Sequence, residues 1–141
     1  MNIKITRIDK SLPLPEYHSE GAVAFDMYSR ETVTIEPRSM GRIPTNLIVE
    51  VPKGYMLFIK ERSSLLKKTG LLMTPGFIDQ DYCGPEDEML LQVYNPSDIP
   101  VTIEREMRIA QGAFMPIEIA IFEEVEQIKE VSRGGFGSTG R

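Results

Sequence analysis

Residue types suited to phosphate chemistry gather near the C-terminus of this 141-residue chain. Residues 133–140 read Arg-Gly-Gly-Phe-Gly-Ser-Thr-Gly and contain no apolar run. Glycine N–H groups can wrap an anion, an arginine can fork onto phosphate oxygens, and Phe136 offers a flat face to a base. The same composition is also typical of a disordered tail, so the rest of the chain has to decide between these interpretations.

Two carboxylates stand beside a tyrosine in the run Asp79-Gln80-Asp81-Tyr82. In an extended chain, alternation places Asp79 and Asp81 on the same side. Asp79 is suited to accept a proton from an attacking water, and Tyr82 can pack flat on a furanose and leave no room for an extra hydroxyl. An acidic turn with a core tyrosine is the alternative interpretation.

Three more segments carry polar groups that a core would not choose. Arg62, Ser63 and Ser64 stand at an expected helix start, which either binds an anion or is a plain serine cap. Gln111 lies among apolar residues and can orient a water or phosphate oxygen, or simply bond to a neighbouring strand. Asp26 lies in an apolar strand, so its charge needs an arginine, a hydroxyl or a hydrated metal as partner.

The elements that must position these groups are mostly short strands separated by turn signals. Strands are expected at 2–7, 24–28, 32–35, 43–51, 55–61, 89–94, 100–103, 109–115 and 117–122. One exception is 63–68, where a serine N-cap precedes leucines and lysines precede Gly70, as in a helix of one or two turns. The pattern predicts an all-β sandwich or jelly roll.

Composition sets further limits. The length predicts one domain, and the net charge of −5 argues against binding nucleic acid through the overall field of the protein. Any phosphate chemistry must therefore depend on local arginines or a metal. One cysteine, Cys83, and one histidine, His18, exclude a disulfide framework and a Cys/His zinc cluster within one chain. We expect a soluble protein of the reducing cytoplasm that does not bind membranes.

In order and spacing, these segments resemble the five motifs of the homotrimeric deoxyuridine triphosphatase (dUTPase) family. The matching segments are 24–29, 62–65, 76–84, 108–111 and 133–140. The match runs from residue 22 to residue 140, and five motifs in register are a specific signal.

The resemblance implies an all-β, distorted jelly roll with one short helix and a flexible C-terminal arm. We expect a β-domain over 1–128 and an arm over 129–141 that closes the active site. The family forms homotrimers with shared active sites. The arm could close either the site of its own chain or that of a neighbouring chain, and the sequence leaves both arrangements open. The implied activity is hydrolysis of dUTP to dUMP and pyrophosphate by in-line attack of water on the α-phosphorus. It would supply dUMP for thymidylate synthesis and keep uracil out of DNA.

The resemblance also assigns roles. It makes Asp79 the catalytic group that holds the attacking water, places Gln111 in the phosphate and water network, and has Asp26 position Mg²⁺ through water while the triphosphate holds the ion. The uracil is read mainly by backbone groups, in a slot too narrow for the methyl group of thymine. The residues expected to bind substrate are Arg62, Ser63, Ser64, Met73, Gly76, Phe77, Ile78, Tyr82, Leu90, Arg133, Phe136, Gly137 and Ser138.

Two other functions remain open at this point. One is a dCTP deaminase of the same superfamily, and the other is a catalytically idle relative that binds nucleotide as a regulator.

Residues 85–88 make the segment after Tyr82 longer than the commonest family pattern, so the alignment of Leu90 with the base-reading position depends on how this insertion folds.

Overall fold

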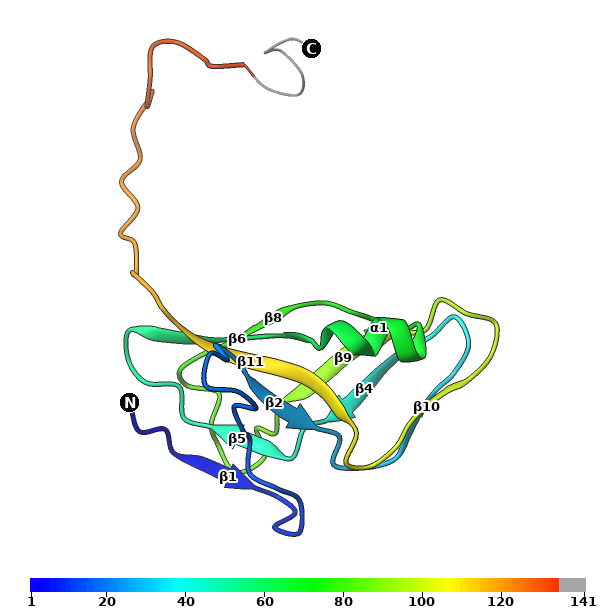
Figure 1. Cartoon of the computed structure of the whole chain (residues 1–141). Coiled ribbons are helices and arrows are strands. Elements are labelled where there is room, and N and C mark those ends of the chain that lie inside the picture. Colours follow the sequence, from blue (N-terminus) through cyan, green and yellow to red (C-terminus); the bar gives the residue numbers. More distant parts are fainter. Residues whose placement is uncertain (135–141) are drawn as a thin grey trace.

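The computed structural model describes residues 1–134, in which all regular elements except one short helix are antiparallel strands (Figure 1). One sheet has four strands in the order β2 (Phe25–Tyr28), β11 (Arg108–Pro116), β6 (Tyr55–Glu61) and β8 (Gly76–Ile78). A second sheet has three strands in the order β4 (Met40–Pro44), β9 (Leu90–Tyr94) and β7 (Leu72–Met73). Two further pairs join β1 (Ile5–Arg7) to β5 (Leu47–Val49) and β3 (Val33–Ile35) to β10 (Val101–Ile103).

Alternation of apolar and polar residues decides which face of each strand is buried. In β6, Leu57 and Ile59 point inward, and in β9, Leu91 and Val93 do the same. Side chains from both larger sheets belong to one hydrophobic cluster, so the core lies between the sheets. The all-β prediction is confirmed.

The only helix in residues 1–134 is α1 (Ser63–Thr69), which follows β6 directly. It ends as expected at Gly70, whose positive φ of 72° lets its N–H reach the Leu66 carbonyl at 2.8 Å. The expected serine N-cap is wrong. Arg62 occupies the N-cap position without a side-chain cap bond, and Ser63 is already inside the helix.

Two strand predictions also need correction, and two short strands were not predicted. The strand expected over 43–51 is two strands, because Asn46 adopts a left-handed φ of 71° between β4 and β5. Residues 117–122 alternate like a strand but lie in an irregular segment. The short strands β7 and β8 were missed, since each depends on pairing with a distant partner, β9 and β6 respectively.

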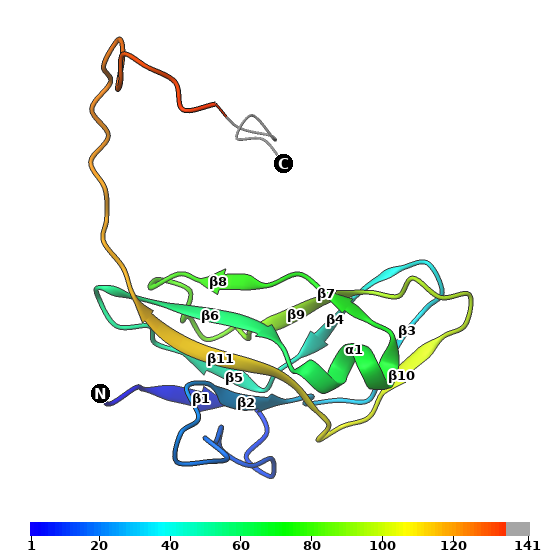
Figure 2. The same cartoon turned by 45° about the horizontal axis from the view of Figure 1, so that its top comes forward.

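The chain leaves the body after β11 (Figure 2). A hydrogen bond from the Ile117 N–H to the Gly54 carbonyl, 2.9 Å long, ties down the start of this segment. Farther along, Ile119, Ile121 and Phe122 are 80–97% exposed. Among residues 1–134, no helix is long and apolar enough to cross a membrane. The boundary at residue 128 stays a prediction.

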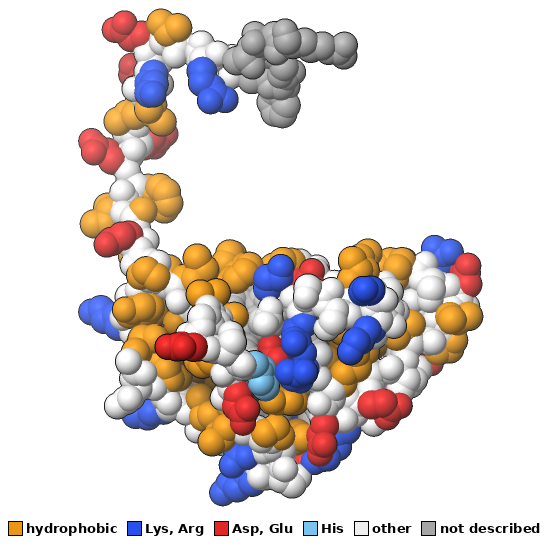
Figure 3. Space-filling view, viewed as in Figure 1, with side chains coloured by type: hydrophobic (Ala, Val, Ile, Leu, Met, Phe, Trp, Pro, Cys, Tyr) orange, Lys and Arg blue, Asp and Glu red, His pale blue; other side chains and the backbone are white. Residues whose placement is uncertain are grey.

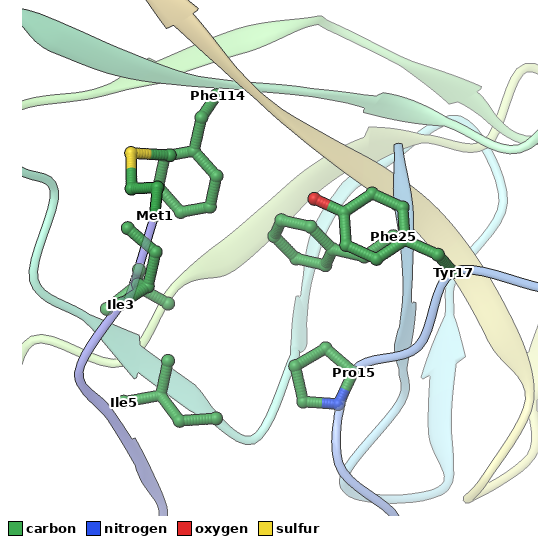
Figure 4. A pocket seen from close by; sticks show the side chains of 8 residues that line it. Met1, Ile3, Ile5, Pro15, Tyr17, Phe25 and Phe114 are labelled. Atoms are coloured by element: carbon green, nitrogen blue, oxygen red, sulfur yellow. The ribbon is translucent and has the colours of Figure 1, made fainter. Parts of the chain in front are cut away.

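An apolar cavity of about 380 Å³ lies where the N-terminal segment passes β2 and β11 (Figure 4). Ile3 and Ile5 line one side, Tyr17 and Phe25 line the other, and Phe114 lies near Met1 at the top of the view. The Phe25 ring packs against both Tyr17 and Phe114, with centroids 5.9 Å away in each case. The Tyr17 hydroxyl is the one polar side-chain group in this lining, so the cavity is mainly apolar and does not bring together the polar groups of a reaction site.

A test of this packing is Gly112→Ala in β11. A methyl group there would stand 2.6 Å from the Phe25 ring and 3.2 Å from Leu57, so a ring in the core must shift. We expect the free energy of unfolding in urea to fall by about 1–3 kcal/mol. Gly21→Ala is the control, because a methyl group there meets nothing within 4 Å. Equal stability of the two variants would contradict the described packing of β11 on the core.

Candidate active site

A buried carboxylate, Asp26 on β2, is the centre of the first cluster of predicted site residues. Its side chain is 2% exposed. Oδ1 lies 3.3 Å from Arg62 Nε and accepts a hydrogen bond from Gln111 Nε2 at 3.1 Å. Oδ2 lies 3.3 Å from Arg108 Nη1 and 3.2 Å from His18 Nε2. The partner that the sequence required for Asp26 is thus a set of four nitrogen donors.

Strand register explains why these donors meet. β11 pairs with β2 so that Gln111 stands opposite Asp26, and the register shifts between Arg108 and Ala110. Arg62 follows β6, and its N–H donates to the Ile109 carbonyl at 3.2 Å, which ties the start of α1 to β11. Ser63 and Ser64 come next, at the first turn of α1. The second and fourth motifs therefore lie together beside the first, as expected.

His18 was missed by the sequence analysis. Its contact with Asp26 depends on an isolated bridge in which the Asp26 N–H donates to the Glu16 carbonyl at 3.0 Å. Figure 3 shows this histidine beside Lys and Arg side chains on one face of the body. The only sequence signal was that the sole histidine stands eight residues before the buried acid.

The contacts of Asp26 also decide whether it can bind a metal ion directly. Both oxygens of Asp26 already face cationic or amide donors. Within residues 1–134, no group of three or more His, Cys, Asp or Glu side chains could hold an ion. Asp26 therefore does not fit a protein-held ion, and a Mg²⁺ at this site would have to be held mainly by the triphosphate. The contact of Asp26 with this ion through water stays a prediction.

A second cluster forms a slot of about 290 Å³ between β6, β7, β8 and β9. All five residues expected to read the base line it, namely Met73, Gly76, Phe77, Ile78 and Leu90. Phe77 stands opposite Phe58 in the register of β8 and β6, with ring centroids 5.6 Å apart. Thr74 and Gln92, which the sequence analysis did not single out, add polar groups to the slot.

Asp79 follows the slot at the end of β8, beside a second cavity of about 530 Å³. Asp79 and Asp81 both line this cavity, but not through strand alternation as expected. The strand ends at Ile78, and a turn follows in which the Tyr82 N–H donates to the Asp79 carbonyl at 3.3 Å. Tyr82 comes out of this turn with 38% of its surface exposed.

Asp79 and the Asp26 cluster lie toward opposite ends of β6, with the slot beside residues 57–59 between them. Ile78 pairs with Leu57 near the start of this strand, whereas Arg62 directly follows its end at Glu61. The six residue-to-residue steps from Met56, which lines the same cavity as Asp79, to Arg62 span about 20 Å of extended chain. Within one chain, Asp79 and the Asp26 cluster therefore cannot act on the same phosphorus atom.

Arg133 is exposed in the extended C-terminal segment, followed by Gly134 with a φ of 78°. Phe136, Gly137 and Ser138 lie outside the described residues, so their roles stay predictions.

A family model for dUTPase matches residues 10–140. The chain belongs to the dUTPase family. Curated relatives include the deoxyuridine 5'-triphosphate nucleotidohydrolases of Dictyoglomus turgidum and Caldanaerobacter subterraneus subsp. tengcongensis. The first is 40% identical over 99% of both chains, and the second is 42% identical over 99% of this chain and 97% of its own.

Solved dUTPases share the fold. A point mutant of the Staphylococcus bacteriophage 80alpha dUTPase with dUpNHpp has a TM-score of 0.86 and 26% identity, covering 99% of this chain and 98% of its own. A phage phi11 dUTPase mutant, described with a structural Mg(II) ion, has a TM-score of 0.81 at 22% identity, covering 90% of this chain and 98% of its own, and supports the fold alone. The resemblance to dUTPases and the jelly-roll fold class are therefore confirmed.

Asp26→Asn tests the first cluster. The amide keeps the shape but removes the charge that compensates Arg62 and Arg108, whose side chains are only 24% and 42% exposed. We expect the free energy of unfolding in urea to fall by about 1–3 kcal/mol, less than for a fully buried pair because solvent screens both arginines. Asp98→Asn, which breaks the exposed pair with Arg38, is the control and should be near neutral. Equal values for both variants would contradict the anchoring role of Asp26.

Proposed function

We propose that this chain is a dUTP pyrophosphatase that hydrolyses dUTP to dUMP and pyrophosphate. The observation that carries the proposal is the slot in which all five residues expected to read uracil meet, directly before Asp79 and Tyr82. The relatives named as deoxyuridine 5'-triphosphate nucleotidohydrolases and the dUpNHpp-bound phage enzyme support it.

The residues divide the work as follows. Asp79 accepts a proton from the water that attacks the α-phosphorus, and it lies beside a cavity large enough for this water. Tyr82 packs on the deoxyribose and excludes a 2'-hydroxyl. Arg62, with Ser63 and Ser64, binds phosphate oxygens, and Gln111 orients the phosphate and water network. Bound to the triphosphate, Mg²⁺ would neutralise charge that develops on the leaving pyrophosphate.

Each active site is built from more than one copy of the chain. A general base must lie within hydrogen-bond reach of its water, directly or through one further water, and a gap of about 20 Å exceeds this limit. Asp79 of one copy therefore works with Arg62 and Asp26 of another. A closed homotrimer satisfies this requirement with equivalent interfaces, and it is the assembly that we propose.

The exposed segment over 117–131 supports such an assembly. Large apolar side chains recur along it, and Ile121 and Phe122 are 97% and 95% exposed. A monomer gains nothing by leaving these groups in water. Beyond this segment, Arg133 together with Phe136, Gly137 and Ser138 would close over the bound nucleotide. The cytoplasm is the proposed compartment, since the one exposed thiol, Cys83, needs no oxidising environment.

A nucleotide panel tests the activity. The purified protein with Mg²⁺ is given dUTP, UTP, dTTP or dCTP in separate reactions, and pyrophosphate and nucleoside monophosphate are measured. We expect fast release from dUTP alone, because Tyr82 rejects ribose and the slot rejects a methyl group, and we expect loss of turnover when a chelator removes Mg²⁺. Conversion of dCTP to a uracil nucleotide would indicate the deaminase, and no reaction with any nucleotide would indicate an idle, regulatory relative.

Mixing two inactive variants tests the shared site. Asp79→Asn lacks the base and Arg62→Gln lacks a phosphate ligand, so each should be nearly inactive alone. When the two are unfolded together in equal amounts and refolded, one site in four draws both residues from the intact copies, and about one quarter of wild-type activity should return.

The control mixes Asp79→Asn with the Asp79→Asn/Arg62→Gln double variant, in which no arrangement contains an intact Asp79. It should stay inactive, and refolded wild-type protein sets the scale. Failure of the first mixture to regain activity, with wild-type protein refolding well, would mean that one copy supplies both groups.

A further inference from the structure

A buried ion pair outside the five motifs leads to the sugar-binding tyrosine. Arg30, just after β2, forms a two-pronged bridge with Glu88, just before β9: Nε to Oε1 and Nη2 to Oε2, each 2.9 Å. The side chains are only 24% and 10% exposed. The hydrogen bonds to Glu88 raise the pKa of the Arg30 guanidinium above its ordinary value.

Glu88 is held from a second direction. The same Oε1 accepts the Asn46 N–H at 2.8 Å, and Asn46 is itself fixed by two hydrogen bonds with the backbone of Asp9, of 2.6 and 2.9 Å. Next in the chain, Met89 exchanges backbone bonds with its neighbours, donating to Leu47 at 3.0 Å. Glu88 therefore has a fixed position in the body of the protein.

The backbone of Glu88 contacts Tyr82, one of the residues predicted to bind substrate. The Tyr82 hydroxyl donates to the Glu88 carbonyl at 3.2 Å. Between these two residues the chain forms a turn closed by Asp87, which accepts the Gly84 N–H at 2.6 Å and donates its own N–H to the Gly84 carbonyl at 3.1 Å. The insertion at 85–88 thus folds on itself and delivers Glu88 to Arg30 and to the tip of the tyrosine ring.

We propose that Arg30 is a positioning residue for sugar selection, acting through Glu88 on Tyr82. The proposal rests on the proposed function, in which the Tyr82 ring lies against the deoxyribose. A ring rejects a 2'-hydroxyl only if it cannot move away, and Tyr82 is 38% exposed and lies outside the strands, just after a turn. The Arg30–Glu88 bridge supplies the missing rigidity at the tip of the ring.

The decisive variant is Arg30→Gln, which removes the charge and the fork but keeps a polar side chain. The ratio of kcat/KM for dUTP to that for UTP should fall about tenfold, mainly because UTP is rejected less well. Arg30→Lys, which keeps the charge but lacks the planar fork, should recover part of this loss. Glu88→Gln breaks the same bridge from its other end and serves if Arg30→Gln does not fold.

The matched control is Arg38→Gln. Arg38 also pairs with a distant carboxylate, Asp98, at 2.9 Å, but both side chains are mostly exposed and lie outside the site. This variant should keep the wild-type ratio. A general loss of stability would change the melting temperature without changing the ratio, so the ratio separates positioning from a purely structural role.

Tyr82→Phe tests whether Arg30 acts on sugar selection through the Tyr82 hydroxyl. This change removes the hydroxyl that contacts Glu88 and keeps the ring, so adding Arg30→Gln to it should have little further effect on the ratio. An undiminished effect in that background would mean that Arg30 acts by another route, and a wild-type ratio in folded Arg30→Gln would overturn the inference. If wild-type protein does not hydrolyse dUTP, the proposed function fails instead, and calorimetric binding of dUpNHpp and its ribose counterpart to the same variants tests the positioning separately.

Discussion

β6 is hydrogen-bonded on both edges, to β11 along its whole length and to β8 over residues 57–59 in its middle. This double pairing fixes what each end of the strand can contribute. Its end leads into Arg62 and the Asp26 cluster, and its start carries Asp79 through β8. No rotamer change can close a gap set by the length of an extended, doubly paired strand. The separation of Asp79 from the Asp26 cluster is therefore a property of the fold itself.

The two halves differ in how they are solvated. Asp26 is buried and surrounded by four side chains with nitrogen atoms, so Arg62 and Arg108 are held in fixed orientations. Such preorganisation avoids reorganisation during the reaction. On the other half, Phe77, Leu90 and Tyr82 are 64%, 43% and 38% exposed. Covering these exposed apolar groups with a base, a sugar or another chain lowers the free energy, because apolar surface is removed from water.

The sequence predicted local features well and long-range ones poorly. Met73 to Ile78 and Leu90 were expected to meet and do so, and Gly70 ends α1 as its αL conformation requires. His18 was not found, because its contact with Asp26 depends on a bridge through Glu16 that no local pattern encodes. The turn after Ile78 was hidden by an alternation of residue types that is typical of strands. Phe136 to Ser138 lie outside the described residues, so their predicted roles depend on the family motif alone.

The wrong strand at 117–122 follows from the same constraint as the split site. Its alternation of apolar residues is typical of a half-buried strand, yet Ile119 and Ile121 are 80% and 97% exposed. A strand needs a partner edge and a surface to bury its apolar face, and in the part of the chain that the structure describes this segment pairs with neither sheet after Ile117. A sequence pattern can be right about what a segment is suited to do while the partner belongs to another molecule. In the homotrimer that we propose, a further copy of the chain would complete both the divided site and the unpaired apolar segment.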